Sequence, residues 1–421
     1  MLTTTNDELF VAPDRDEPKV PMSTSSDFLD SDQLTALTPA KLTQKMIELE
    51  PEITRQAAKA ERMRRPVPTI WSAIQESGFF YQFVPKEFGG LNTTVDDFID
   101  SALPISRACP STGWNACFCA GHNILLAHFP RYTQRELWRG DFPYIISPLL
   151  TAPPGRAISC EGGFRVSGCW EWGSGVMNAD WIFAMVMSDD PAITKPGVVL
   201  IPTSEVTVLD TWHMDGLKGS GSNTVVVKDI FVPTDRAQWA TELYTGRTET
   251  SKGFKNPIYR TPLVMRASFF ATVAVVGAAQ GAAQQIRSAL HERQQTNPAP
   301  QEIPTKYSRL GQADLMVKTA EILLRETARK MLCAPDLSDN DLTTLRIEAR
   351  GKFSYAVKLC RDAAALLSSG AGANVHRLDA AFQRYVRDIN LMASHAGFDE
   401  DQSFELQGRS LLDLEPNTPM F

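Results

Sequence analysis

The strongest constraint on the fold is the order of helical and β-rich segments along the chain. Apolar residues recur at helical spacing up to about residue 144. Short β-branched and aromatic runs, separated by glycines, prolines and acids, follow to about residue 239, and long helical stretches then return. Single strands do not alternate with single helices, so a parallel sheet is not expected. The sequence predicts an α+β protein with an N-terminal helical domain, a central antiparallel β-barrel and a C-terminal four-helix bundle.

Local signals locate several helices of the first block. Thr38 followed by Pro39 predicts an N-cap and a first helical turn. A second helix is predicted to run through Phe79 and to end before Pro85. A third helix, starting after residues 110–112, is apolar on nearly every side, which predicts deep burial.

Four long helices are predicted in the last block: 267–293, 310–333, 342–369 and 378–396. Glycines at 370 and 372 separate the last two. The most apolar run, 267–279, is too short to span a bilayer and contains Gly277, so it is interpreted as a buried helix.

Negative charge is concentrated at the N-terminus. Residues 1–35 hold eight acids and two bases, which accounts for most of the net charge of −7. This segment has no basic start followed by an apolar run, so it is predicted to be a flexible acidic tail and not a secretion signal. The predicted division is a tail at 1–36, a helical domain at 37–144, a β domain at 145–255 and a bundle at 256–421.

Composition excludes several classes of function. The seven cysteines are odd in number and form no CxxC pair, so buried thiols in a reducing cytoplasm are expected. No metal is expected, because metal-binding His spacings are missing. The sequence has no dense basic stripe, which argues against nucleic-acid binding. It also has no GxGxxG motif, which argues against a Rossmann domain.

Three segments, in order, resemble the acyl-CoA dehydrogenase family. Residues 84–90 read VPKEFGG, 212–222 read WHMDGLKGSGS, and 277–283 read GAAQGAA. The resemblance covers roughly residues 40 to 415 and implies that family's fold. Fold does not decide chemistry, so the catalytic positions need separate inspection.

The catalytic glutamate of the shorter-chain dehydrogenases is missing. Residues 387–396 read RDINLMASHA, which places Ala396, preceded by His395, where the family's proton-abstracting glutamate stands. Alanine cannot accept a proton, and Glu400 or Glu405 remain as alternative bases.

Three motifs resemble instead the oxygenase component of two-component flavin monooxygenases, which act on hydroxyphenylacetate, steroid rings and indole. They are RDINLMASHA at 387–396, SGCWEWGSG at 167–175 and STGWNACFCAGH at 111–122. The resemblance implies reduced FMN or FAD from a separate flavin reductase, with O2 as co-substrate. A C4a-hydroperoxyflavin would then oxygenate a small aromatic substrate such as indole or a phenol. A soluble cytoplasmic homotetramer, without membrane or nucleic acid, is expected.

The resemblance also implies a flavin site. Ser174 would lie beside flavin N5, Gly175 would allow close backbone approach, and Trp172 would pack beside the ring. Core filling is the alternative for Trp172, and the favoured interpretation for Trp170 and Trp181.

Two histidines and a tryptophan are predicted to line the substrate pocket. His395 would exchange a proton or hydrogen bond with the substrate, and the alternative is a helix-capping role. His122 would be a second catalytic contact, with a buried structural histidine as the alternative. Trp114 belongs to the same motif.

Arg293, Gly370 and Arg387 are predicted to contact the flavin phosphate across subunits, with surface salt bridges as the alternative for the arginines. Other functions stay open: an amine N-hydroxylase, an acyl-CoA dehydrogenase with a displaced base, and a non-catalytic flavin-binding scaffold.

Overall fold

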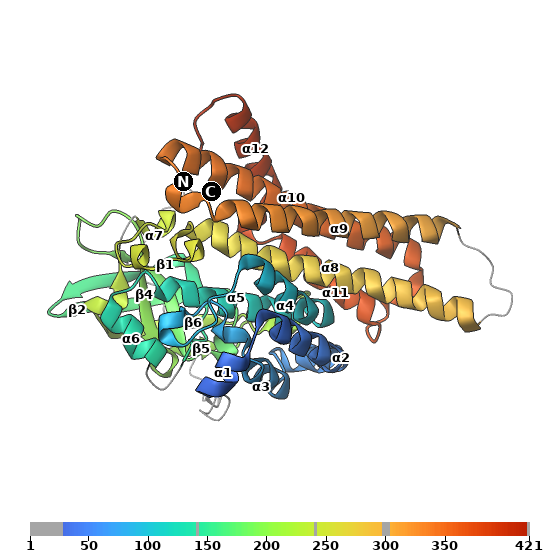
Figure 1. Cartoon of the computed structure of the whole chain (residues 1–421), viewed down its shortest axis with the longest axis horizontal. Coiled ribbons are helices and arrows are strands. Elements are labelled where there is room, and N and C mark those ends of the chain that lie inside the picture. The colour runs from blue at the N-terminus through green and yellow to red at the C-terminus, as the bar shows by residue number, and fades with distance from the viewer. Residues whose placement is uncertain (1–27, 140–142, 240–241, 297–303, 419–421) are drawn as a thin grey trace.

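The computed structural model describes residues 28–139, 143–239, 242–296 and 304–418. Figure 1 shows a sheet at one end of the molecule and two long helices that extend away from it as an arm. The arm consists of α8 (Leu263–Thr296) and α9 (Pro304–Met331). The predicted order of helices, strands and helices is confirmed.

The helices before the sheet begin where local signals predict. Thr38 caps the first of the long helices by accepting a hydrogen bond from the Lys41 backbone N–H, and Pro39 is its first residue. The bounds are α1 (Ser31–Ala36), α2 (Pro39–Met63), α3 (Pro68–Glu76), α4 (Val95–Ala108), α5 (Pro110–Leu126) and α6 (Arg131–Arg139).

Two predictions for this block need correction. The helix expected to run through Phe79 ends at Glu76, because Gly78 takes a left-handed conformation (φ +93°) that breaks it, and a short 3-10 helix follows. The predicted tail is also too long at its C-terminal side, because residues 31–36 form α1 with a capping box at Asp30. Residues 1–27 lie outside the described residues.

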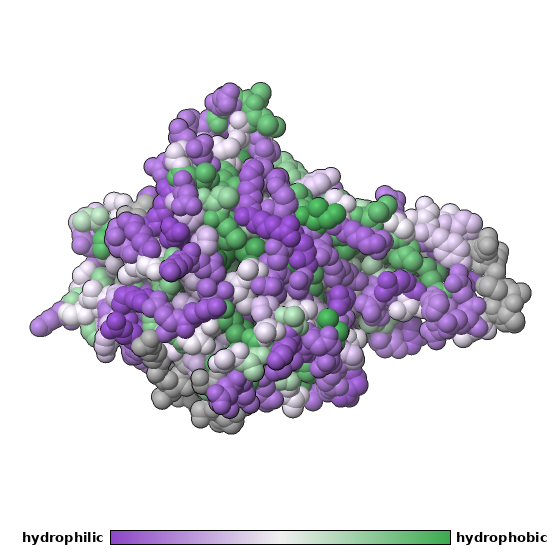
Figure 2. Space-filling model, viewed as in Figure 1, coloured by the Kyte–Doolittle hydropathy of each residue, from purple (hydrophilic) through white to green (hydrophobic). Residues whose placement is uncertain are grey.

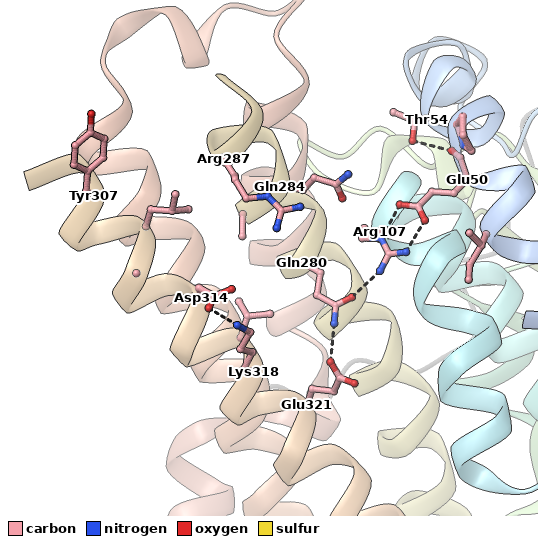
Figure 3. Close-up of a pocket in the computed structure, with 16 residues that line it drawn as sticks. Glu50, Thr54, Arg107, Gln280, Gln284, Arg287, Tyr307, Asp314, Lys318 and Glu321 are labelled. Carbon is pink, nitrogen blue, oxygen red and sulfur yellow. Dashed lines mark hydrogen bonds and ion pairs between the residues drawn. The ribbon is translucent and has the colours of Figure 1, made fainter. Parts of the chain in front are cut away.

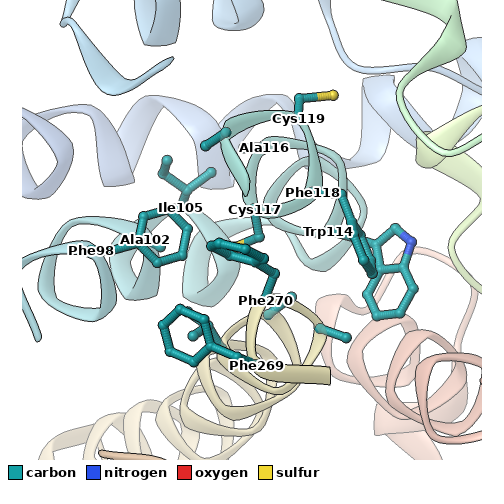
Figure 4. Packing of buried hydrophobic residues seen from close by; sticks show 14 of the residues in the cluster. Phe98, Ala102, Ile105, Trp114, Ala116, Cys117, Phe118, Cys119, Phe269 and Phe270 are labelled. Atoms are coloured by element: carbon teal, nitrogen blue, oxygen red, sulfur yellow. The ribbon is translucent and has the colours of Figure 1, made fainter. Parts of the chain in front are cut away.

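Helix α5 is the centre of the main hydrophobic core. All of its residues are buried, as its all-round apolar composition predicts. It packs on α4 and α8, and Figure 4 shows Phe98, Phe269 and Phe270 on one side of this junction, with Trp114 and Phe118 together on another. The face of α5 that carries Trp114 and Phe118 is therefore separate from this junction.

The β unit is one seven-stranded sheet with the order β5-β6-β2-β1-β3-β4-β7. The prediction of an antiparallel barrel is wrong for one pair, because β1 and β3 run parallel. In the described residues β5 and β7 are edges, so the sheet is open. The strands are β1 (Leu149–Cys160), β2 (Gly163–Trp170), β3 (Trp181–Ser188), β4 (Gly197–Pro202), β5 (Thr207–Leu209), β6 (Thr224–Pro233) and β7 (Ala237–Gln238).

The last block is helical. A short α7 (Glu242–Thr245) precedes α8, and α9 is followed by α10 (Asp339–Ala371), α11 (Ala381–Ala393) and α12 (Glu400–Leu411). Helices α8 to α11 pack on one another, α4 and α5 add to α8, and α12 adds to α10. Helix α8 has the length and composition of a membrane span, but 83% of its most apolar window is buried, as in the core helix of a soluble protein.

Candidate functional site

One face of α5 presents three aromatic side chains at four-residue spacing, which places them in a row. The ring centroids of Trp114 and Phe118 are 4.8 Å apart, and those of Phe118 and His122 are 5.6 Å apart. All three side chains are buried. The row forms one wall of the candidate site.

Ser174 meets this wall from the sheet. It lies in a tight turn after β2, which Gly175 closes with a left-handed backbone (φ +93°). A side chain at Gly175 would collide with Cys119 Sγ at 2.5 Å, so this close approach requires glycine. The indole Nε1–H of Trp114 donates to Ser174 Oγ (3.0 Å), which fixes the hydroxyl against α5.

Two further serine hydroxyls continue a chain of hydrogen bonds from Ser174. Ser222 Oγ lies 2.9 Å from Ser174 Oγ, and Ser220 Oγ lies 2.8 Å from Ser222 Oγ. Both serines belong to the loop between β5 and β6. Their role was not predicted from the sequence, although both belong to the WHMDGLKGSGS segment.

His395 reaches the same wall from the C-terminal helices. Its ring lies edge-on to Trp114 (centroids 5.8 Å apart) and near Phe118 (6.3 Å). Its Nδ1 accepts the backbone N–H of Gly397 (3.1 Å), so the neutral ring carries its proton on Nε2. His395 thus caps a helix, but as a neutral acceptor at the N-cap of the 3-10 helix Ala396–Phe398 and not as a cation that compensates a dipole, and this leaves Nε2–H as a donor.

The structure thus brings together His395, Ser174, His122 and Trp114. Trp114 contacts both His395 and Ser174, and Phe118 contacts both histidines. These residues come from separate parts of the chain.

Desolvation favours the neutral form of both histidines. It lowers the pKa of His122 to about 4, with the charge of Arg266 adding to the effect, and lowers the pKa of His395 to about 4. His395 nevertheless remains accessible to solvent in the single chain. Water that reaches the ring opposes this lowering of its pKa.

The polar atoms of His122 leave one position for a ligand. Its Nδ1–H donates to the Ser147 carbonyl oxygen (2.7 Å), so Nε2 is an acceptor. Nearby, Ser147 Oγ is buried without a hydrogen-bond partner in the described residues.

Arg266 is a buried cation that the sequence analysis missed. One nitrogen contacts His128 Nε2 (3.1 Å), while Nη2 has no partner, and no carboxylate in the described part of the chain pairs with it. Burial lowers its pKa to about 9, so it stays charged at neutral pH. An unpaired buried charge is costly, and this charge acts on His122, whose pKa it helps to lower. Its signal was an arginine at the start of the apolar α8.

Trp172 provides a flat apolar surface beside Ser174. It is 53% exposed, has a left-handed backbone (φ +65°) and meets Trp212 edge-on at 5.5 Å. An exposed indole held in a strained conformation next to a fixed hydroxyl fits a planar ring with a polar edge, as in flavin. Trp170, by contrast, fills the core of the sheet as predicted.

The three residues predicted to contact the flavin phosphate lie in different parts of the structure. Arg293 and Gly370 lie in the last turns of α8 and α10. Arg387 forms an ion pair with Glu61 (2.5 Å) and donates to the Asp215 carbonyl oxygen. A phosphate at Arg387 would therefore compete with Glu61, and the phosphate role of all three remains a prediction.

Another groove lies elsewhere in the molecule. It has a volume of about 1130 Å³ between α2, α8 and α9, and Figure 3 shows charged and amide side chains around it. Arg107 pairs with Glu50 there, and Gln280 bridges Arg107 and Glu321. None of the predicted site residues lines it, and its wall holds no histidine or tryptophan. The aromatic cluster, where donors, acceptors and a ring surface converge, is the candidate site.

Other chemistries find less support in the geometry. The two glutamates considered as displaced bases are both on α12: Glu400 pairs with Arg361 (2.6 Å) and Glu405 accepts from Asn417 (2.7 Å). Within the described residues, no three His, Cys, Asp or Glu side chains are close enough to hold a metal ion.

Known proteins share both the sequence and the fold. Residues 269–400 match the family model "Acyl-CoA dehydrogenase, C-terminal domain". A pigment production hydroxylase of Rhodococcus sp. is 33% identical over 91% of this chain and 99% of its own length. The oxygenase component of an FADH2-dependent resorcinol hydroxylase of Rhizobium sp. is 29% identical, over 86% and 91%. The structure of XiaF from Streptomyces sp. with FADH2 and glycerol superimposes with a TM-score of 0.82, at 29% identity over 91% and 98%. The chain belongs to the flavin-dependent monooxygenase oxygenase components, an oxidoreductase family with the acyl-CoA dehydrogenase fold.

Proposed function

We propose that the chain uses reduced FMN or FAD and O2 to hydroxylate a small aromatic compound such as a phenol or indole. Bound reduced flavin supplies two electrons and activates O2, so that one oxygen atom enters the ring and the other leaves as water. The observation that carries the proposal is the position of Trp114. It donates to Ser174 and contacts His395, so the two predicted catalytic groups share one wall.

Residues at the sheet side would hold the cofactor. Trp172 offers a ring surface, Ser174 offers a hydroxyl to the polar edge of the flavin, and Gly175 allows the backbone to approach. Trp114 and Ser222 both contact the Ser174 oxygen, which limits the directions in which its proton can point. Such fixed donors favour oxygen transfer over unproductive loss of H2O2.

Residues at the helical side would hold the substrate. The Nε2 acceptor of His122, Ser147 Oγ and the unpaired nitrogen of Arg266 together suit a ring hydroxyl that loses its proton. His395 presents Nε2–H to the reacting oxygen or the substrate. Phe118 packs against both histidines and keeps the site apolar.

The names of relatives support this substrate class. One is a resorcinol hydroxylase, another is a p-hydroxyphenylacetate 3-hydroxylase oxygenase component, and a third is an indole-3-acetate monooxygenase. All three names refer to an aromatic ring. We infer the same class here, together with a separate flavin reductase as the partner.

The wider organisation follows from the same proposal. We infer domains at 37–144, 145–255 and 256–421, a cytoplasmic location and a homotetramer. Arg293, Gly370 and Arg387 would then contact the flavin phosphate across subunits. Exposed apolar residues on α9 support assembly, and Figure 2 shows green surface along the arm.

Rapid mixing tests the function. The purified chain with reduced FMN or FAD is mixed with oxygenated buffer, and the flavin spectrum is followed. We expect a transient absorbance distinct from both reduced and oxidised flavin, because the site shelters the reactive state. Appearance of oxidised flavin at the free-solution rate would contradict the proposal. Product analysis with phenols, indole and amines then distinguishes ring from nitrogen oxidation.

A further inference from the structure

A carboxyl group outside the aromatic cluster lies where three parts of the site meet. Asp388 is on α11, two turns before His395, and is almost fully buried. Its Oδ1 accepts the backbone N–H of Leu217 (2.7 Å), and its Oδ2 accepts the hydroxyl of Ser111 (3.5 Å). Ser111 lies one turn before Trp114 on α5, and Leu217 belongs to the loop between β5 and β6. The carboxyl group therefore joins α5, α11 and this loop.

The loop held by this carboxyl group supplies two contacts of the candidate site. Leu217 has a left-handed backbone (φ +46°), which a branched residue adopts only when its surroundings hold it there. Its carbonyl oxygen accepts the indole N–H of Trp212 (2.8 Å), and Trp212 meets Trp172 edge-on at 5.5 Å. Further along the loop, Ser222 contacts Ser174 (2.9 Å). A shift at Leu217 would move both contacts.

The positively charged side chains near Asp388 pair with another acid, so among the residues that the structure describes Asp388 is not part of an ion pair. Glu61 on α2 binds the nearest arginines, Arg384 (3.1 Å) and Arg387 (2.5 Å), and lies 4.0 Å from Lys218. In the described residues no cation donates a hydrogen bond to Asp388. Burial accordingly raises the pKa of Asp388 to about 7. The group is an acceptor for two defined donors and not part of an ion pair.

We propose that Asp388 is a positioning residue that holds the loop 212–222 against α5 and α11, so that Ser174, Trp172 and His395 keep one geometry. This inference rests on the proposed function, because it requires the three groups to serve one flavin and one substrate. Misplacement of such groups by a fraction of a bond length lowers the yield of product more than it lowers stability.

The loop geometry is measurable without flavin. Trp172 and Trp212 are close enough for their indole transitions to couple, which gives a paired circular dichroism signal in the far ultraviolet. Trp172→Phe assigns this signal. Asp388→Asn should keep it, because an amide oxygen can still accept from Leu217. Asp388→Ala should lose most of it, and Asp379→Ala, an exposed position just before α11, should leave it unchanged.

The second measurement is coupling, the fraction of flavin oxidised that yields hydroxylated substrate and not H2O2. We expect Asp388→Ala to lower coupling roughly ten- to a hundredfold and Asp388→Asn to stay near wild type. If Asp388→Ala does not fold, Asp388→Gln replaces it, since its amide oxygen lies one methylene too far.

Two results would overturn the proposal. One is a wild-type Trp signal and wild-type coupling in Asp388→Ala despite a lower melting temperature, which would make the residue merely structural. The other is the same loss of signal and coupling in Asp388→Asn as in Asp388→Ala. If the wild-type chain itself oxidises no aromatic compound, the proposed function fails, and the Trp signal alone then decides whether Asp388 holds the loop.

Discussion

His395 combines two roles that can be separated atom by atom. Its Nδ1 accepts the Gly397 N–H, and its Nε2–H is the group to which we assign the proposed chemistry. Asparagine can replace the first role but not the second, whereas alanine replaces neither.

We therefore expect His395→Asn and His395→Ala to lower coupled hydroxylation to a similar extent, roughly 100-fold or more. Only the alanine variant should also lose stability, by about 1 kcal/mol for the missing cap. Product yield and urea denaturation measure the two effects. An asparagine variant that retains full coupling would show that the imidazole is not needed.

His122 predicts a pH dependence of stability. Its pKa is about 4 in the folded chain and about 6.5 when unfolded. Between these values the unfolded chain binds the proton more tightly, so stability is present above pH 6.5 and is lost as the pH falls toward 4.

We expect His122→Gln, which cannot titrate, to lose less stability than wild type on acidification, by on the order of 3 kcal/mol. Urea denaturation at pH 7.5 and at pH 4.5 measures this difference. His291→Gln, at an exposed position, is the matched control and should follow wild type. Parallel curves for wild type and His122→Gln would contradict the buried neutral state.

At the scale of elements, glycines bring three helices close together behind the site. Gly113 on α5 and Gly277 on α8 both face Ser106 on α4. A Cβ at Gly277 would lie 2.5 Å from Ser106 Cβ, and one at Gly113 would lie 2.5 Å from Ser106 Cα. The α4–α5–α8 junction, which supports the row of aromatic side chains, depends on this close approach.

Gly277→Ala should therefore destabilise the protein by about 1–3 kcal/mol, because the added methyl group forces the helices apart. Gly311→Ala on α9 is the control: nothing lies within 4 Å of its Cβ position. There alanine should be neutral or stabilising by about 0.5–1 kcal/mol, because it favours the helix. Equal melting temperatures for the two variants would contradict the close packing of α8 on α4 at Gly277.

At the scale of the whole molecule, the arm leaves apolar residues uncovered. Leu315 and Ile322 are seven residues apart on α9, so they share one face, and they are 66% and 69% exposed. Such a face is typical of a subunit contact.

If copies of the chain assemble there, Leu315→Glu combined with Ile322→Glu should shift the sedimentation of the purified protein to smaller species. Phe231→Glu, an exposed apolar position on β6, should not shift it. A wild-type chain that already sediments as a monomer at micromolar concentration would contradict the proposed tetramer.

The sequence predicted those features that depend on neighbouring residues. Thr38 and Pro39 start α2 because capping is a local interaction, and α5 is buried because its composition alone demands it. The parallel pairing of β1 with β3 was missed, since a strand pattern does not specify its partner.

The candidate site was predicted only where a family motif covered it. Trp114 and His395 are 281 positions apart, so no periodicity connects them. Only the resemblance to a known family indicated that both belong to one site. Arg266 and Asp388 were missed because charged residues on helices are usually solvated, and only the tertiary structure shows that these two are buried. Ser222 was not predicted because its partner, Ser174, lies in the turn after β2, far from Ser222 in the sequence.

The exposure of Trp172 affects how the purified protein should be handled. Just over half of the surface of this residue is exposed to water, and its backbone has a left-handed conformation. If Trp172 borders the flavin as proposed, protein purified without flavin exposes this apolar ring surface to dyes, detergents and other planar compounds. Ligand screens on such material would then detect binding to Trp172 first, and adding flavin beforehand would separate these compounds from those that bind at the aromatic cluster.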